Sequence, residues 1–212
     1  MADVNMISGA EDGAIAAWIA ERLKAALAAQ SEGNIAISVP GGSTPFPIFA
    51  ALGQPDGRFA GIDWSRIVVW PGDDRIVPED HPASNTGKIR ALLEPLGAQV
   101  QTLSAEVVPP HFALVWLGMG NDGHVASLFP NTDPQPDDPL PVRRLTPDPL
   151  PPEAPFDRIT LTMPSLLDSD ALMFVIRGAD KQALFEQAVR GGHDLPIARL
   201  LGAARQAITC FN

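Results

Sequence analysis

The spacing of apolar residues changes along the chain, and each change marks an expected element. After Glu11, apolar residues recur every three or four positions through an alanine-rich segment, which predicts a helix with one face toward the core. The residues with this spacing are Ile15, Trp18, Ile19, Leu23 and Leu27. Ser8 and Glu11 have the spacing of a capping box, so we expect Ser8 to cap this helix.

Short apolar runs elsewhere predict buried strands, and helix signals follow several of them. The expected strands cover residues 35–39, 67–70, 112–117, 158–163, 171–176 and 207–211. Helices are expected from Pro45, from residues 84–86 to Leu93, and from about Ala179 to Val189. This alternation predicts a doubly wound α/β fold, in which a mostly parallel sheet has helices on both faces. With 212 residues, of which 45% are hydrophobic, we expect one α/β domain over residues 1–212.

Polar segments follow three of the expected strands directly. They are Gly41-Gly42-Ser43-Thr44, Asp73-Asp74-Arg75 and Asp122-Gly123-His124. Because ligands bind at the carboxyl ends of parallel strands, we expect the three segments to meet at one rim of the sheet.

The first two segments each admit two interpretations. The glycine segment is either a tight turn in which Thr44 caps a helix beginning at Pro45, or a phosphate-binding turn with N–H groups and hydroxyls around an anion. It is neither a Walker loop nor a dinucleotide-binding turn, so nucleotide binding is unsupported. Residues 73–75 form either a solvated loop with an internal ion pair or part of a site.

The third segment holds an acid and an imidazole two residues apart, among several glycines. It is either a structural turn in which Asp122 accepts backbone hydrogen bonds, or a catalytic pair. The sequence contains no HExxH, GxSxG or CxxC motif, and the other histidines (His81, His111, His193) lack the spacing of shared metal ligands. We therefore expect chemistry through activated water, without a metal.

A proline-rich segment follows this loop. Residues 130–155 hold ten of the 22 prolines, a density that predicts a long irregular loop without regular structure.

Charge and cysteine content narrow the possible partners. The formal net charge of -10 argues against nucleic acid and anionic membranes, so a local cluster must bind any anionic ligand. Cys210 is the single cysteine; it suits a reducing compartment, and we expect it to fill a late strand. Because no signal peptide and no apolar run of about 20 residues is evident, we expect a cytoplasmic protein.

Three motifs together resemble 6-phosphogluconolactonase. They are Gly41-Gly42-Ser43-Thr44-Pro45; Asp73-x-Arg75-x-Val77-Pro78 with Ser84-Asn85; and Leu117-Gly118-Met119-Gly120-x-Asp122-Gly123-His124-x-Ala126-Ser127-Leu128-Phe129-Pro130. The resemblance extends to Arg158-Ile-Thr and to Gly178-x-x-Lys181.

This resemblance implies hydrolysis of 6-phosphoglucono-1,5-lactone without cofactor or metal, on a fold shared with glucosamine-6-phosphate deaminases. It implies that His124 is the general base and that Asp73 and Asp122 orient the water, the imidazole or the sugar hydroxyls. The phosphate-binding residues that it implies are Gly41, Gly42, Ser43, Thr44, Arg75, Arg158 and Lys181. The expected partner is a phosphorylated sugar lactone, and the expected assembly a monomer or weak homodimer.

Two alternatives remain. A deaminase-type isomerase shares Asp-Gly-His but resembles Phe-Asn-Glu-Pro where this chain has Ser127-Leu128-Phe129-Pro130, and the missing Glu counts against it. A non-catalytic sugar-phosphate sensor predicts a DNA-binding domain, for which we expect no room in this chain. The sequence also has Asp74 where the lactonases usually have Glu, which leaves the role of that position open.

Overall fold

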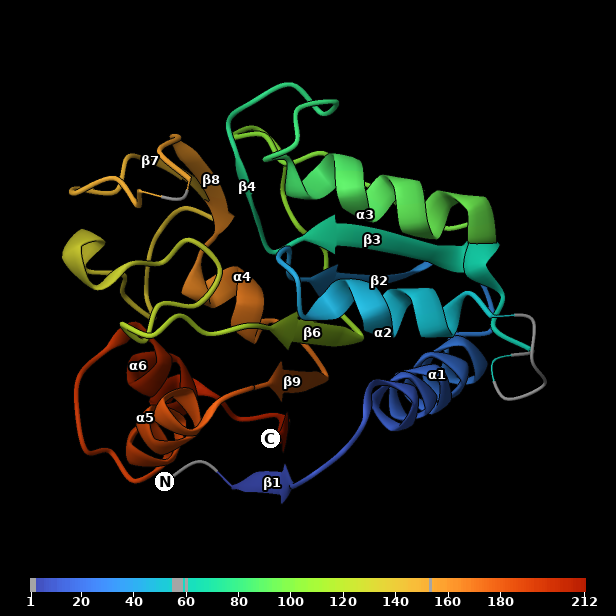
Figure 1. The fold of residues 1–212 in the computed structure, drawn as a ribbon. Helices are drawn as coiled ribbons and strands as arrows, with labels where there is room; N and C mark the ends of the chain where they lie inside the picture. Colours follow the sequence, from blue (N-terminus) through green and yellow to red (C-terminus); the bar gives the residue numbers. More distant parts are fainter. Residues whose placement is uncertain (1–2, 55–58, 60, 153) are drawn as a thin grey trace.

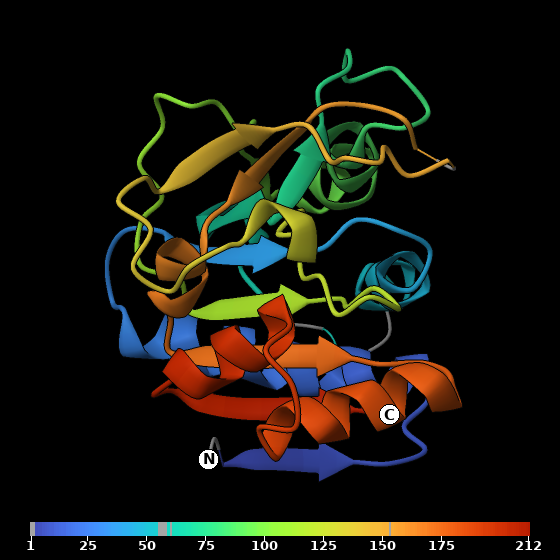
Figure 2. The same cartoon turned by 90° about the vertical axis from the view of Figure 1, so that its left-hand side faces the viewer.

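The computed structural model describes residues 3–54, 59, 61–152 and 154–212, and a parallel sheet of seven strands lies at its centre (Figures 1 and 2). The strands follow the order β1-β10-β9-β6-β2-β3-β5. Their bounds are Val4–Ile7 (β1), Ile35–Val39 (β2), Ile67–Pro71 (β3), Gln99–Val100 (β5), Leu114–Leu117 (β6), Ala171–Val175 (β9) and Ala207–Phe211 (β10). No helix of the described residues is long and apolar enough to cross a bilayer.

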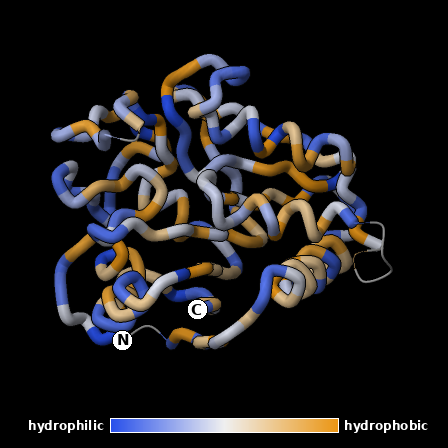
Figure 3. The backbone as a smooth tube through the Cα atoms, in the orientation of Figure 1, coloured by the Kyte–Doolittle hydropathy of each residue, from blue (hydrophilic) through white to orange (hydrophobic). Residues whose placement is uncertain are grey.

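Helices cover both faces of this sheet, as the alternating pattern predicts. One face packs against α1 (Asp12–Ala29), α2 (Pro45–Leu52) and α3 (Asn85–Leu93), and the other against α4 (Met163–Leu167), α5 (Ala179–Val189) and α6 (Pro196–Ala203). Short 3-10 turns lie at Trp64–Arg66, Glu94–Leu96 and Pro130–Thr132. The central strands β2, β6 and β9 are buried along their whole length. Their continuous apolar runs are what a sheet covered on both faces requires. Figure 3 shows hydrophobic segments in the central part of the molecule.

A second, antiparallel sheet was not predicted. It has the order β4-β8-β7, with β4 at Asp73–Arg75, β7 at Val142–Leu145 and β8 at Arg158–Leu161. Of the two interpretations of residues 73–75, the solvated loop is wrong, because these residues pair with β8. The expectation that residues 130–155 lack regular structure is also wrong, because residues 142–145 contain no proline and keep every N–H available for pairing.

Neither of the two predicted helix caps forms a side-chain hydrogen bond. The N-cap of α1 is Glu11, without a side-chain cap, while Ser8 lies in the turn that joins β1 to the helix. That turn is fixed elsewhere, since Gly9 N–H donates to the Asn212 carbonyl at 2.7 Å. Thr44 precedes Pro45 at the start of α2, as expected, but its hydroxyl makes no cap hydrogen bond. Both proposed caps are thus wrong in detail, although α2 begins at the predicted residue.

Cys210 lies buried in β10, as predicted. Burial raises the pKa of its thiol to about 12, so this group stays protonated and inert at neutral pH.

Candidate active site

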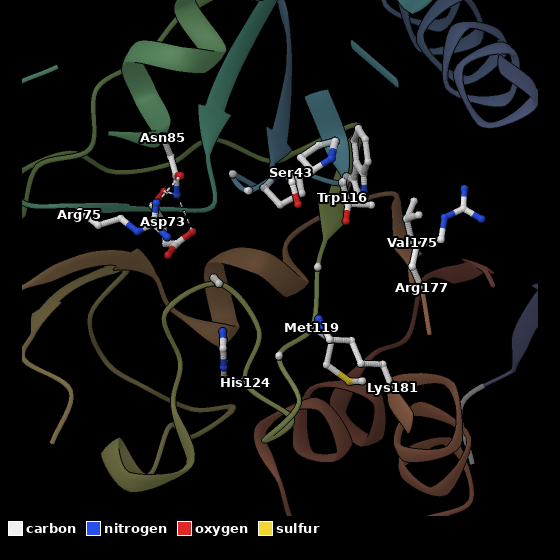
Figure 4. A pocket seen from close by; sticks show the side chains of 18 residues that line it. Ser43, Asp73, Arg75, Asn85, Trp116, Met119, His124, Val175, Arg177 and Lys181 are labelled. Carbon is white, nitrogen blue, oxygen red and sulfur yellow. Dashed lines mark hydrogen bonds between the residues drawn. The ribbon is translucent and has the colours of Figure 1, made fainter. Parts of the chain in front are cut away.

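The loops that follow β2, β3, β6 and β9 meet at the carboxyl rim of the main sheet and enclose a cavity of about 330 Å³ (Figure 4). The polar side chains that line it are Ser43, Thr44, Asp73, Arg75, Asn85, His124, Arg177 and Lys181. The sequence predicted this meeting of the three polar segments, and the cavity has the size of a small-molecule site.

The imidazole of His124 is held from one side by Asp122. Its Nδ1 lies 2.6 Å from Asp122 Oδ1, and the same oxygen accepts the backbone N–H of His124 at 3.2 Å. A carboxylate at Nδ1 favours the tautomer with hydrogen on that nitrogen, which leaves the lone pair on Nε2. The ring packs on Phe129, with 4.6 Å between centroids, and the side chain keeps 31% exposure.

Two glycines shape this loop around the imidazole. A Cβ on Gly120 would lie 2.2 Å from the His124 ring, so only glycine admits the ring in this position. Gly123 has a φ of 78°, which other residues rarely adopt, and its carbonyl accepts the N–H of Ile197 at the start of α6. The loop is therefore held by a hydrogen bond within it, from the Gly120 N–H to the His124 carbonyl, and by one from α6.

Asp122 is ionised in this arrangement. Its partial burial disfavours the charge, but the hydrogen bond and the charge of His124 outweigh burial and lower the pKa of the Asp122 carboxyl below its usual value. The pair thus combines a stable anion with a nitrogen base.

Asp73 lines the cavity beside Arg75 and Asn85 (Figure 4) and is held in a polar network. Its carboxylate accepts the Ser127 hydroxyl, and its backbone carbonyl accepts Asn85 Nδ2 at 3.1 Å. Burial raises the pKa of the Asp73 carboxyl, and the hydrogen bond from Ser127 and the charge of Arg75 oppose this shift only in part. Asp73 therefore binds a proton more readily than Asp122 does.

Asn85 organises this wall of the cavity. Its Oδ1 accepts Arg75 Nη1 at 2.9 Å, and its amide group lies against Gly41, where a Cβ would come within 2.0 Å. Gly41 is therefore required for the approach of two loops that are far apart in sequence. Gly42 has a φ of 93°, and Ser43 and Thr44 remain exposed at the mouth of the cavity.

Asp74 has a structural role. Its buried carboxylate accepts the backbone N–H groups of Arg75, Asn85 and Thr86 at 2.6 to 2.9 Å, and the Ser84 hydroxyl at 3.1 Å. The negative charge at the start of α3 also interacts favourably with the helix dipole. Asp74 thus fixes Asn85, and through it the wall that carries Asp73 and Arg75.

The comparisons with known proteins agree with this architecture. The model of the family described as glucosamine-6-phosphate isomerases/6-phosphogluconolactonase matches residues 11–209. The chain belongs to this family. A protein from Mesorhizobium japonicum named 6-phosphogluconolactonase is 32% identical over 93% of this chain and 89% of its own length.

Other relatives carry the same name. A 6-phosphogluconolactonase from Pseudomonas aeruginosa is 34% identical over 89% of this chain and 86% of its own length. The crystal structure of a 6-phosphogluconolactonase from Shewanella baltica superposes with a TM-score of 0.80 at 26% identity, covering 99% of this chain and 97% of that one. The predicted resemblance and fold are therefore confirmed.

Within this family member, the cavity gathers most of the predicted site residues but not all. Gly41 to Thr44, Asp73, Arg75, His124 and Lys181 line it, while Asp122 lies behind His124. Arg158 does not line it. Its guanidinium is buried and donates to the backbone carbonyls of Phe156 and Ala154, and burial together with the charge of Arg75 lowers its pKa.

Three residues at this site were not predicted from the sequence to belong to it. Asn85 and Ser127 stood within the quoted motifs, but only their contacts with Asp73 reveal their part. Arg177 comes between the end of β9 and the start of α5, and the strand-end rule applied to Gly41 and Asp73 could have found it. No group of three or more His, Cys, Asp or Glu residues within the described ranges could hold a metal ion.

Proposed function

We propose that this protein hydrolyses 6-phospho-D-glucono-1,5-lactone to 6-phospho-D-gluconate, the second step of the oxidative pentose phosphate pathway, with water activated by His124 and without a metal. The observation that carries the proposal is the Asp122–His124 pair at the cavity, with Nδ1 bound to a carboxylate at 2.6 Å. The relatives named 6-phosphogluconolactonase support the choice of substrate.

The reaction needs only modest chemistry. His124 Nε2 removes a proton from water as the oxygen attacks C1 of the lactone, and the ionised Asp122 stabilises the imidazolium that forms. The tetrahedral intermediate collapses, the bond from C1 to the ring oxygen breaks, and the imidazolium returns the proton to that oxygen. The products are a carboxylic acid, which ionises, and a free hydroxyl group.

Asp73 is suited to a different task from Asp122. Its raised pKa and its position beside Arg75 and Asn85 fit a group that orients a sugar hydroxyl or the attacking water. Two carboxyls with opposite shifts are typical of a site that divides binding from proton transfer.

The phosphate end of the substrate is assigned to cations and N–H groups at the cavity. Gly41 to Thr44 present the start of α2 with two exposed hydroxyl groups, and Arg75 and Lys181 supply positive charge. Anchoring the phosphate would fix C1 against His124. The resemblance also assigns Arg158 to phosphate binding. To reach an anion, its guanidinium would have to leave the carbonyls of Phe156 and Ala154.

An assay with two substrates tests the proposal. Freshly prepared 6-phosphogluconolactone should release acid well above the spontaneous rate, whereas glucosamine 6-phosphate should release no ammonia. Ammonia release without lactone hydrolysis would establish the isomerase alternative, and binding of 6-phosphogluconate without turnover of either compound would establish the sensor.

A further inference from the structure

The cations of the cavity are unevenly placed. Figure 4 shows Asp73, Arg75 and Asn85 together on one side, with Arg177 on the far side and Lys181 below it. Arg75 is tied to that first side by Asn85 Oδ1 at 2.9 Å and the Ala83 carbonyl at 3.0 Å. The side away from Asp73 therefore depends on Arg177 and Lys181 for positive charge.

Arg177 is in a weak ion pair. Its Nη2 lies 3.2 Å from Asp12 Oδ1, longer than the usual 2.7–2.9 Å of a charge-assisted hydrogen bond, and the two side chains are 40% and 44% exposed. Among the described residues, Asp12 is the one hydrogen-bond partner of this guanidinium. An exposed pair of this kind contributes little to stability, so a stronger anion can replace Asp12 at little cost.

The neighbouring Lys181 gives a second reason to expect an anion here. It lies in the first turn of α5, where a cation is unfavourable next to the positive end of the helix dipole. Arg177 lies in the connection from β9 to α5, four residues before Lys181, and both side chains line the cavity. A doubly charged phosphate between them would compensate both charges.

We propose that Arg177 binds the phosphate of the substrate together with Lys181, and exchanges the Asp12 carboxylate for a phosphate oxygen when it does so. This inference rests on the proposed function for the identity of the substrate, but not on the chemistry of His124. It assigns to Arg177 the cationic contact that the buried Arg158 does not make at this cavity.

Arg177→Ala and a matched control measure the contact directly. Arg190 is also an arginine of the α5 region, pairs with Glu186 at 3.6 Å and does not line the cavity, so Arg190→Ala removes the same charge elsewhere. By calorimetry, Arg177→Ala should bind 6-phosphogluconate at least about ten-fold more weakly than the wild type, Arg177→Lys should recover part of the affinity, and Arg190→Ala should bind normally.

Kinetics separate phosphate binding from a structural effect. Arg177→Ala should raise KM for 6-phosphogluconolactone about ten-fold or more and change kcat little, while Arg190→Ala should keep both values. Asp12→Asn, which removes the competing carboxylate, should lower KM. Unchanged affinity in Arg177→Ala, or a loss in kcat with KM unchanged, would overturn the assignment.

The same measurements distinguish this inference from the proposed function. A wild-type protein that binds 6-phosphogluconate but hydrolyses no lactone would refute the function and still test Arg177 through binding. A wild-type protein that binds no sugar phosphate would overturn both.

Discussion

Two imidazoles lie at opposite ends of β6, and both contact carboxylates, yet only one of them is suited to catalysis. His111 precedes the strand, with Nδ1 2.6 Å from Asp168 and Nε2 3.0 Å from Asp170. His124 follows the strand, and of its two ring nitrogens only Nδ1 has a hydrogen-bond partner among the described residues, the side chain of Asp122.

The difference lies in the second ring nitrogen. At His111 the hydrogen bonds to Asp168 and Asp170 raise the pKa of the imidazole and so favour its protonated form, and both ring nitrogens are occupied. At His124 one carboxylate orients the ring, and Nε2 remains available at a cavity lined by Arg75, Arg177 and Lys181. A carboxylate beside an imidazole therefore produces a base only when it leaves one nitrogen free.

The largest effect among the supporting residues is expected at Asp122. Asp122→Asn removes the charge that stabilises the imidazolium, and its amide can donate to Nδ1 and select the wrong tautomer, so kcat should fall about 10²-fold or more. Steady-state kinetics with 6-phosphogluconolactone measure the loss. Asp168→Asn, the same change at His111, should leave kcat unaltered, and equal losses in both variants would break the comparison.

Gly120→Ala tests the placement of the His124 ring. The new Cβ would lie 2.2 Å from the imidazole, so the ring must move, and a displacement of about 1 Å can reduce turnover about 10²-fold. Gly202→Ala in α6, where a Cβ meets no atom within 4 Å, is the control. Normal kcat in Gly120→Ala would show that the ring position is not critical.

The sequence indicated that His124 pairs with an acid, but it gave no sign that His111 contacts two carboxylates, and the reason is physical. Asp122 and His124 are two residues apart, so a local pattern contains their contact. Asp168 and Asp170 reach His111 from 57 and 59 residues away, across the junction of α4 and β9. A single sequence contains no sign of such pairing.

The same difference between local pattern and distant pairing explains which strands were predicted from the sequence. The strands β2, β3, β6, β9 and β10 are apolar runs and were predicted from local pattern. The missed β1 is a four-residue edge strand with two exposed positions, and β4 consists of Asp73, Asp74 and Arg75, whose strand conformation comes from pairing with β8. These elements depend on distant partners, as do Asn85 and Arg177 at the site.

Asp73→Asn tests whether the buried charge of Asp73 lowers the stability of the folded protein. Because burial raises the pKa of folded Asp73, its ionised form is penalised in the folded state; this penalty is absent below the unfolded pKa of about 3.9 and develops as pH rises through the folded value. The melting temperature of Asp73→Asn should therefore exceed that of the wild type at pH 7, and the difference should vanish in acid. A destabilised variant at pH 7 would contradict this account of Asp73.

His111→Gln should have the smallest effect. Because the pKa of folded His111 is raised, its ion pairs stabilise the protein fully below the unfolded pKa of about 6.5, and this stabilisation is lost as pH rises through the folded value. The side chain is 54% exposed, so the loss in denaturant unfolding at pH 5.5 should stay below about 1 kcal/mol and disappear at high pH. A constant loss at all pH values would exclude the ion pairs as its cause.

The two imidazoles also provide the most direct test of the central claim, that His124 activates water. His124→Asn and His111→Asn should be compared for kcat with 6-phosphogluconolactone, after subtraction of spontaneous hydrolysis, and for binding of 6-phosphogluconate. We predict that His124→Asn binds the product normally and loses about 10²- to 10⁴-fold in kcat, while His111→Asn keeps full turnover. Near-full turnover in His124→Asn would contradict the claim and make Asp73 the next candidate for the base.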